Sequence, residues 1–378
     1  MGVWWASLTA PGGMGVRSKP MLCSRGALRV PLPPKLSHYH PSGELDQKTA
    51  SDYESTPAGS PRRQTAMLVL VTGGTGYIGH GVLAALGRAG HAARCLVRRG
   101  SEAKQRTCYP QQVEIVNGDV LDPAALEQAV AGCAAVLHLV GIIRESPSRG
   151  VTFERLHVEA TRQVVRACER QGLRRYLHMS ALGARPDGVS DYQRTKYRAE
   201  EIVRASGLDW TIFRPSVVYG YGDGHQNFLD QLYGLMVIGG VLPMPVVPVI
   251  GNGRSLLQPV HLDNLSAGLV RALATPESVR QTYEIGGPVP LTYEQILRAV
   301  ERQTRRYRLH LHLPLTLMKP LVRALQRLPF FPLTSDQLAM LEEGSVCDPK
   351  PFFDTFKLTP IDFHEGLATQ FQTLYARA

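Results

Sequence analysis

Three glycines with the spacing GxxGxxG are the residues of this sequence best suited to chemistry. The motif is Thr72-Gly73-Gly74-Thr75-Gly76-Tyr77-Ile78-Gly79, with an apolar strand pattern before it and a helical pattern after it. At such a junction the first glycine permits a tight turn, the second lets the backbone approach a pyrophosphate, and the third lets the helix pack on the strand. The amide groups at the helix N-terminus then bind phosphate oxygens. We therefore predict a dinucleotide site that includes Gly73, Thr75, Gly76, Tyr77, Ile78 and Gly79.

The second predicted strand ends without an acidic residue. In an NAD(H) site an acidic residue at this place binds the ribose 2′-hydroxyl, about 20 residues past the glycines. Here Arg98 and Arg99 follow Val97. Arginine binds phosphate through charge-assisted, bidentate hydrogen bonds, so the pair predicts NADP(H) over NAD(H). The alternative is a solvated surface pair.

The third predicted strand ends in Asn117-Gly118-Asp119-Val120. A carboxylate here can accept a hydrogen bond from the adenine amino group, so Asp119 and Val120 are candidate cofactor residues. The alternative is a turn aspartate that caps the following segment.

Several segments together resemble the extended and atypical short-chain dehydrogenase/reductases. They are GGTGYIG at 73–79, Gly118-Asp119, HMSALGA at 178–184, YQRTK at 192–196 and RPSVVYG at 214–220. Within that superfamily the chain is most similar to the branch of the NADPH-binding accessory subunit of respiratory complex I and its bacterial relatives. The segments that carry this closer resemblance are residues 153–161, 251–261 and 332–365. The resemblance covers about residues 67–375.

The resemblance implies a catalytic Ser180, Tyr192 and Lys196. The spacing of four places Tyr192 and Lys196 on one face of a helix. An ammonium beside a phenol lowers the tyrosine pKa, so that the tyrosine exchanges a proton with a substrate oxygen. By resemblance, Lys196 also reaches the nicotinamide ribose and Ser180 binds the reacting carbonyl.

Two further segments would line the nicotinamide side, again by resemblance. The residues concerned are Leu139, Val140, Gly141, Pro215, Val217 and Val218. One departure concerns the long helix predicted between these two segments, over roughly Phe153–Gln171: His157 stands where many catalytic members carry an asparagine that organises a proton-relay water. Turnover is therefore an open question, and we interpret His157 as a packed helix histidine rather than a base.

The elements that must position these residues alternate between strands and helices. Uninterrupted apolar strands in such an alternation predict a doubly wound, parallel α/β Rossmann sheet over residues 67–222, with ligands at the carboxyl ends of its strands. The predicted strands are Met67–Thr72, Ala92–Val97, Val113–Val116, Ala134–Val140, Arg175–Ser180 and Trp210–Phe213. After Gly222 the alternation ends, and residues 223–378 are expected to form a smaller, mostly helical lobe. One run, Thr282–Ile285, could return to the main sheet.

The composition of the chain limits the classes of partner that we expect it to bind. The chain has 378 residues and a net charge of +10, but its basic residues form no block and no nucleic-acid motif. We expect no nucleic-acid binding, and anionic small molecules or an anionic membrane explain the charge as well. The six cysteines show no metal-type spacing, so no metal site is predicted and the thiols indicate a reducing compartment.

Residues 1–66 show no apolar periodicity, and residues 1–43 contain no acidic residue. We interpret this part as a transit peptide or as a mis-assigned start before Met67, and we favour the second. The protein is then cytoplasmic or peripheral to a membrane if bacterial, and in an organelle matrix if the extension is a transit peptide. Leu232–Ile250 has no charge but contains three prolines, so we predict a folded segment there rather than a membrane span.

The tail between residues 313 and 331 has apolar residues at helical spacing and a basic stripe of Lys319, Arg323 and Arg327. It is an ordinary amphipathic helix or a surface that contacts an anionic membrane or a membrane complex.

Two candidate functions follow from these observations taken together. The first is an NADP(H)-dependent oxidoreductase or epimerase acting on an apolar carbonyl or hydroxyl compound. The second is a non-catalytic, NADPH-holding structural or assembly subunit of a membrane-associated NADH:quinone oxidoreductase.

Overall fold

The computed structural model describes residues 66–101, 113–222, 227–238, 246–328, 331 and 333–377. These residues belong to one compact unit, Thr65–Ala378. The interpretation of residues 1–66 as an extension therefore falls outside the described residues, apart from Ala66.

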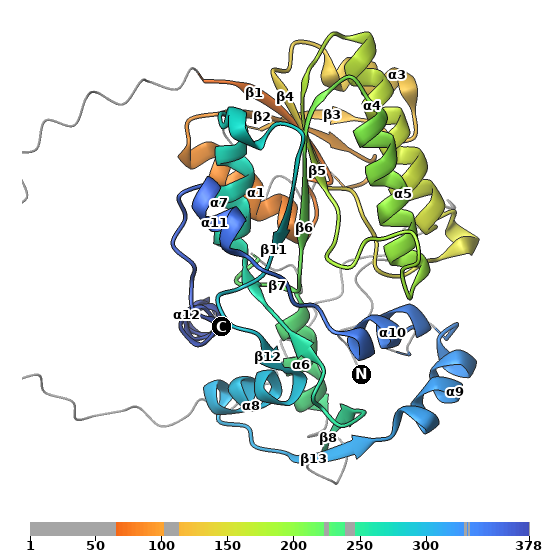
Figure 1. The fold of residues 1–378 in the computed structure, drawn as a ribbon, viewed down its shortest axis with the longest axis vertical. Helices are drawn as coiled ribbons and strands as arrows, with labels where there is room; N and C mark the ends of the chain where they lie inside the picture. The colour runs from red at the N-terminus through yellow and green to blue at the C-terminus, as the bar shows by residue number, and fades with distance from the viewer. Residues whose placement is uncertain are drawn as a thin grey trace, which may run out of the picture. The chain divides into compact units, whose positions relative to one another are not determined.

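A sheet of seven parallel strands forms the centre of the unit (Figure 1). The strand order is β11-β6-β5-β4-β1-β2-β3, so the direction of winding reverses between β1 and β4. The strands are β1 (Leu68–Thr72), β2 (Ala92–Val97), β3 (Val113–Asn117), β4 (Ala135–His138), β5 (Arg175–Met179), β6 (Asp209–Pro215) and β11 (Gln281–Ile285). The predicted doubly wound α/β fold is confirmed, and the predicted return of Thr282–Ile285 is realised by β11, which pairs with β6.

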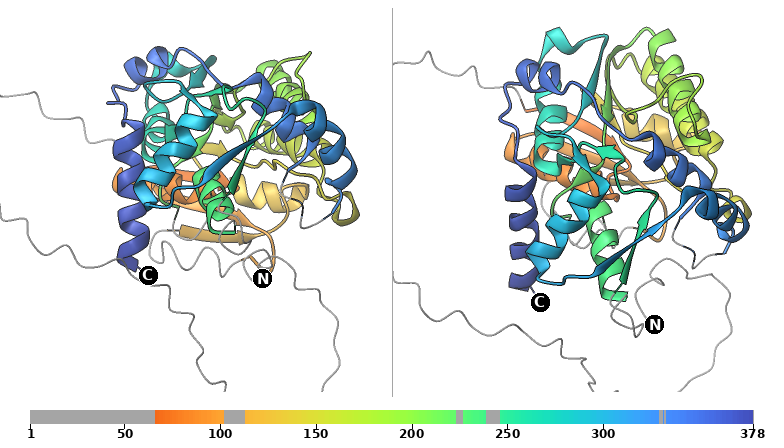
Figure 2. Two further views of the ribbon diagram at one scale, coloured as in Figure 1. Left: turned by 90° about the horizontal axis from the view of Figure 1, so that it is seen from below. Right: turned by 60° about the horizontal axis from the view of Figure 1, so that its bottom comes forward.

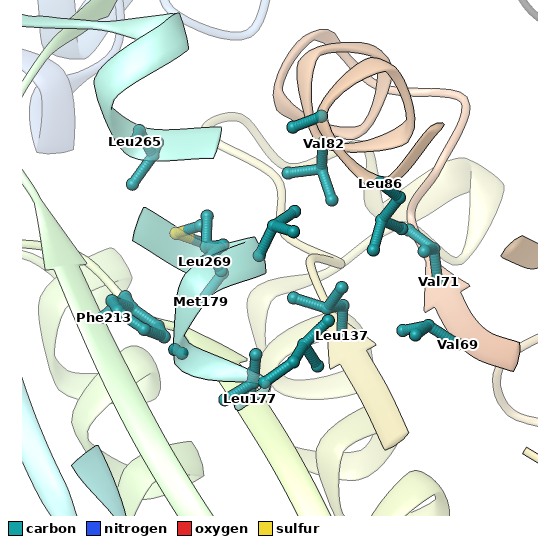
Figure 3. Close-up of a cluster of buried hydrophobic side chains, with 14 of the residues drawn as sticks. Val69, Val71, Val82, Leu86, Leu137, Leu177, Met179, Phe213, Leu265 and Leu269 are labelled. Carbon is teal, nitrogen blue, oxygen red and sulfur yellow. The ribbon is translucent and has the colours of Figure 1, made fainter. Parts of the chain in front are cut away.

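Helices cover both faces of the sheet. One face packs against α1 (Tyr77–Arg88), α7 (Leu262–Ala272) and α11 (Lys350–Thr355). Figure 3 shows part of this core, where Val82 and Leu86 of α1 meet Leu265 and Leu269 of α7 over the strands. The other face packs against α3 (Pro123–Val130), α4 (Ala160–Arg170) and α5 (Asp191–Ala205). Three elements of the sheet and its covering layer, α7, β11 and α11, come from the second half of the chain. The Rossmann part of the structure therefore includes segments beyond residue 222, where the boundary between the two parts was expected.

The remaining elements form the smaller lobe, with its own core. Its helices are α6 (Phe228–Ile238), α8 (Tyr293–Thr304), α9 (Leu315–Leu325), α10 (Ser335–Glu343) and α12 (Phe363–Arg377). Its short strands pair as β7 (Val218–Tyr219) with β10 (Val260–His261), β9 (Leu256–Leu257) with β12 (Leu291–Thr292), and β8 (Val246–Ile250) with β13 (Leu309–Leu313). Figure 2 shows α12 on one side of this lobe and α9 with α10 on the other.

The uncharged run Leu232–Ile250 is divided between α6 and β8, with residues 239–245 outside the described part. None of the helices described is long and apolar enough to cross a membrane. The long helix predicted over Phe153–Gln171 forms in two parts, because a π-helical stretch, Glu154–Glu159, precedes α4. π-Helical turns are often found at functional sites, and this one contains His157.

Candidate functional site

The glycine turn at the end of β1 has a geometry that only glycine can adopt. Gly73 has φ +79°, and a Cβ atom there would lie 3.0 Å from the backbone of Leu139 and Val140. A Cβ atom on Gly79 would lie 2.5 Å from the Gly73 carbonyl oxygen. The turn is thus compressed against the end of β4, beside the point where the winding of the sheet reverses. In such sheets this point is where a dinucleotide binds.

The N-terminus of α1 suits a phosphate. Gly76 caps the helix without a side-chain hydrogen bond, and its first turn has no acidic residue. The free amide groups and the positive end of the helix dipole therefore face the space in front of Gly76. The Tyr77 hydroxyl donates to the Gly220 carbonyl oxygen at 2.9 Å, so this side chain ties the turn to the chain beyond β6. Burial raises the Tyr77 pKa. These features fit a dinucleotide.

The residues expected at the adenosine end lie at the ends of β2 and β3. Arg98 and Arg99 are exposed, and neither guanidinium has an ion-pair partner in the part of the chain that the structure describes. Asp119 accepts a hydrogen bond from the Leu121 amide at 2.9 Å, so its carboxylate already holds the turn that leads into α3. A role of Asp119 toward adenine stays a prediction.

Three segments converge on Lys196, which is almost fully buried on α5. Its Nζ donates to the Met179 carbonyl oxygen at 2.9 Å, at the end of β5. A Cβ atom on Gly141, in the loop after β4, would lie 2.9 Å from the same Nζ. Ser180 follows Met179 directly, and Tyr192 lies one helical turn before Lys196. The fold therefore brings Gly141, Ser180 and the YxxxK pair to one end of the sheet.

The Ser180 hydroxyl is an unfilled position of the site, as are both ring nitrogens of His178 on β5. Its Oγ atom is buried and has no hydrogen-bond partner among the described residues. A buried hydroxyl without a partner is costly, and such groups in native proteins often mark a functional position. The Tyr192 hydroxyl likewise makes no hydrogen bond to a described residue. Both hydroxyls are therefore available to a ligand oxygen.

Burial dominates the pKa values of this pair. The Tyr192 pKa is raised to about 12 by burial. The Lys196 pKa is lowered from 10.5 to about 8 by burial, which outweighs the opposing effect of Glu200. Burial raises the Tyr192 pKa rather than Lys196 lowering it, and the Lys196 ammonium donates to the Met179 carbonyl oxygen. At neutral pH Tyr192 is a phenol and Lys196 is protonated.

His157 packs beside the tyrosine. Its ring stacks on Phe153 with centroids 5.2 Å apart and meets Tyr192 edge to face at 5.4 Å. Its Nδ1 atom lies 2.9 Å from the Thr195 hydroxyl, and its Nε2 atom lies 3.2 Å from the Ile142 amide. Burial, followed by Lys196, lowers the His157 pKa to about 2. His157 is a neutral, packed histidine that holds the Tyr192 ring in place.

The last predicted segment lies after β6. Pro215 ends this strand, and its carbonyl oxygen accepts from the Leu182 amide at 2.9 Å, so the chain after β5 runs beside it. Val217 and Val218 are half-buried at the start of the smaller lobe. Leu139 and Val140 pack into the hydrophobic cores on opposite faces of the sheet. Gly141, which follows them, is exposed.

Two buried histidines of the site were missed in the sequence. His138 ends β4, and its nitrogens lie 2.7 Å from the Thr72 hydroxyl and 3.2 Å from the Thr161 hydroxyl. Its ring stacks on His178 of β5 with centroids 5.6 Å apart. Burial lowers the His138 pKa to about 3. The signal was a histidine inside each of two consecutive apolar strands, because neighbouring parallel strands place them side by side. Within the described ranges no group of three or more histidine, cysteine or acidic side chains is placed to hold a metal ion.

A C-terminal arm, residues 315–347, was also missed. Arg144, after β4, donates to the carbonyl oxygens of Gln326 at 2.7 Å and Phe331 at 2.6 Å. Glu343 of α10 accepts from Gln193 at 2.6 Å, next to Tyr192. The arm then reaches the end of β6, where the hydroxyls of Ser345 and Ser216 are 2.8 Å apart. It therefore contacts the segments that follow three neighbouring strands of the sheet.

Comparison with known proteins agrees with this geometry. Residues 73–230 match the family described as NAD(P)H-binding. The mitochondrial NADH-ubiquinone oxidoreductase 40 kDa subunit of Neurospora crassa is 25% identical over 326 residues, which cover 83% of this chain and 82% of that protein. The ceramide reductase of Caulobacter vibrioides is 31% identical over 209 residues, which cover 55% of this chain and 62% of that protein.

A solved structure shows the same fold. The dTDP-glucose 4,6-dehydratase of Streptomyces venezuelae, solved with NAD bound, has a TM-score of 0.65 at 20% identity over 82% of this chain and 97% of that chain. The glycine turn, the seven-stranded sheet and these relatives lead to one conclusion. Residues 73–230 of the chain form an NAD(P)H-binding domain, the chain has homologues among the complex I 40 kDa subunits, and its fold is that of an NAD-binding epimerase or dehydratase.

Proposed function

We propose that the protein is an NADP(H)-dependent reductase of an apolar carbonyl compound, with Ser180, Tyr192 and Lys196 as its catalytic residues. The observation that carries this proposal is the buried Ser180 hydroxyl, which has no hydrogen-bond partner among the described residues and directly follows Met179, the residue whose carbonyl oxygen accepts from the Lys196 ammonium. A chain that only held a dinucleotide would gain nothing from burying an unpaired hydroxyl there, because such a hydroxyl is costly without a ligand. The name of the Caulobacter relative, a ceramide reductase, supports a lipid-like substrate.

The raised pKa of Tyr192 favours the direction of reduction. When bound, the cofactor supplies a hydride to the carbonyl carbon. Ser180 donates a hydrogen bond to the carbonyl oxygen, and Tyr192 delivers its phenol proton to the same oxygen, so that a hydroxyl forms. Lys196 returns a proton to the tyrosinate, and its pKa of about 8 makes that transfer favourable near neutral pH. His157 and Phe153 hold the Tyr192 ring during these steps.

A preference for NADP(H) over NAD(H) belongs to the proposal. Arg98 and Arg99 lie exposed just beyond β2, next to the glycine turn of β1. Because they have no ion-pair partner among the residues described, their guanidinium groups are available to a 2′-phosphate. We expect the same site to bind NAD(H) more weakly.

The second candidate function is a non-catalytic, NADPH-holding subunit of a membrane-associated NADH:quinone oxidoreductase. It is favoured by the length of the match to the Neurospora subunit, which spans most of both chains. It is also favoured by His157, whose two nitrogens are engaged by Thr195 and Ile142. In this case the partner is a protein complex and the dinucleotide stabilises the fold.

Location and membrane contact follow from both candidates. A bacterial protein of either kind is cytoplasmic or peripheral to a membrane, and a mitochondrial one lies in the matrix. We propose that residues 313–331, which include α9, contribute to a peripheral membrane contact. The support is that α9 leaves Leu317 and Leu321 exposed and also carries the exposed Arg323.

One complementation experiment separates the two candidates. Tyr192→Phe removes only the hydroxyl, whereas Gly76→Val places a branched side chain where the pyrophosphate approaches. An enzyme loses function in Tyr192→Phe at normal abundance, with turnover slowed about 10²–10⁴-fold. A holding subunit stays functional in Tyr192→Phe and loses function only in Gly76→Val. Full activity of Tyr192→Phe in cells would therefore reject the reductase. A Gly207→Val variant, at a site with open space around it, is the matched control.

A further inference from the structure

Two carboxylates at opposite ends of α10 contact the segment between β5 and α5. Asp336 is the second residue of this helix and Glu343 is the last, so they lie seven positions apart. Seven residues make nearly two helical turns, which places both side chains on one side of α10. Both carboxylates are hydrogen-bonded to residues between the end of β5 and the first turn of α5. Helix α10 therefore contacts this segment through charged groups at two points.

Asp336 supplies hydrogen-bond acceptors to the N-terminus of α5. The first amide groups of a helix have no acceptor within the helix itself. In α5 the Ser190 hydroxyl accepts from the Gln193 amide at 3.2 Å. The next two amides toward the N-terminus, those of Asp191 and Tyr192, hydrogen-bond to the Asp336 carboxylate. The turn that carries Tyr192 is therefore capped by a residue of the C-terminal arm.

The negative charge of Asp336 suits this position. A carboxylate at the N-terminus of a helix interacts favourably with the positive end of the helix dipole. Burial and the nearby Asp191 raise the Asp336 pKa, and the hydrogen bonds from the two amides lower it. The Asp336 side chain is half-buried, so solvent weakens its interactions less than it would at an exposed helix end. Asp336 thus contributes both an acceptor and a favourable charge to the start of α5.

Glu343 joins the two segments that carry the proposed catalytic hydroxyls. Its carboxylate accepts from the Gln193 side chain at 2.6 Å, and Gln193 directly follows Tyr192 on α5. The same carboxylate accepts from Arg185, which belongs to the segment that begins at Ser180. One side chain of the arm therefore links the chain after β5 to the first turn of α5.

Helix α10 is anchored on its other side by α9. Leu338 packs with Met318 and Val322 of α9 in a small hydrophobic core. Glu342 pairs with Lys319 of α9 at 2.9 Å. Figure 1 shows α10 between α9 and the end of α5 that points toward the smaller lobe. Because α9 holds this helix, its two carboxylates have a defined position against the segment between β5 and α5.

We propose that Asp336 and Glu343 are positioning residues, which fix the separation of the Ser180 and Tyr192 hydroxyls. Both hydroxyls must reach one carbonyl oxygen, so a small displacement of either lowers the rate of the chemical step. The dinucleotide turn at the end of β1 is a separate segment, and its affinity for the cofactor should not depend on the two carboxylates. The role in turnover rests on the proposed function, whereas the contact of α10 with the start of α5 does not.

Hydrogen exchange of the full chain without cofactor tests the contact. Asp336→Ala should speed the exchange of the Asp191 and Tyr192 amides at least about tenfold, because these amides have no acceptor within the helix. Asp336→Asn keeps an acceptor oxygen and should restore most of the protection. The matched control is Glu342→Ala, because this neighbouring carboxylate pairs with Lys319 instead, and it should exchange like the wild type. Unchanged exchange at the start of α5 in Asp336→Ala would overturn the proposal, whatever the activity of the protein.

Steady-state turnover with NADPH and a long-chain aliphatic ketone tests the positioning itself. Asp336→Ala and Glu343→Ala should each lower kcat about tenfold to a hundredfold and leave the KM for NADPH within about twofold of the wild type. Asp336→Asn should recover most of kcat, and Glu342→Ala should turn over normally. An unchanged kcat, or a loss that only parallels weaker NADPH binding or a lower Tm, would show that the contact is merely structural. A wild type without turnover would reject the reductase and the role in turnover with it, and the exchange result would still stand.

Discussion

Replacing Lys196 with methionine should reveal how much free energy the folded protein loses by burying the charged ammonium of Lys196. The Lys196 pKa falls from 10.5 to about 8 on burial. Between these two values the unfolded chain keeps the proton and the folded chain loses it, so the stability of the wild type rises with pH in this window. At pH 7 the folded state therefore carries most of the cost of a buried charge, and at pH 10 it carries little. One pKa unit corresponds to about 1.4 kcal/mol. The free energy of unfolding of the wild type, relative to that of Lys196→Met, should therefore rise by about 2–3 kcal/mol from pH 7 to pH 10.

Urea unfolding of both proteins at several pH values measures this change. Differences between the two proteins cancel the titration of the groups that they share, including Tyr192, whose pKa is raised to about 12 in the folded state. The matched control is Lys350→Met, because Lys350 is an exposed residue at the start of α11. Its stability difference should not vary with pH. A difference between wild type and Lys196→Met that stays flat within about 0.5 kcal/mol would show that the ammonium is hydrated, and the geometry at Met179 would be refuted.

Three other variants test separate parts of the site. Arg98→Ala should weaken NADPH binding at least about tenfold in a fluorescence titration and leave NADH binding nearly unchanged, and equal losses would contradict the NADP(H) preference. Gly141→Ala should displace the Lys196 ammonium and slow turnover about tenfold to a hundredfold, while Gly207→Ala should not. Arg144→Ala should lower the free energy of unfolding by about 2 kcal/mol and speed proteolysis near residue 326; unchanged proteolysis would show that the arm is held by other contacts.

The dinucleotide turn was predictable because its causes are local. Gly79 packs on the backbone of Gly73 and Gly74, the positive φ of Gly73 belongs to its own backbone, and the strand before them and the helix after them have distinct apolar patterns. The parallel sheet was predictable for the same reason, since each buried strand is a short apolar run bounded by turn residues. Even the return of β11 left a trace in the run Thr282–Ile285.

The arrangement around the tyrosine was not predictable, because it depends on burial. The sequence indicated that Lys196 would lower the Tyr192 pKa, and the structure instead has burial raising it to about 12. Desolvation depends on all the atoms packed around the ring. These include His157 from a π-helical turn and Phe153 just before that turn, and no spacing in the sequence predicts such a turn.

The sequence by itself determined the strand-helix order, the phosphate-binding turn and the identity of the residues that could do chemistry, because these follow from local backbone geometry and apolar periodicity. Only the tertiary structure decided which of them meet. Lys196 donates to the carbonyl oxygen of Met179, and Arg144 donates to the C-terminal arm, nearly two hundred positions away in the chain. The histidines of β13 face the glutamates of α8. Each of these contacts joins residues whose separation along the chain carries no signal, since they are set by how layers pack and by which polar groups must be paired once water is excluded.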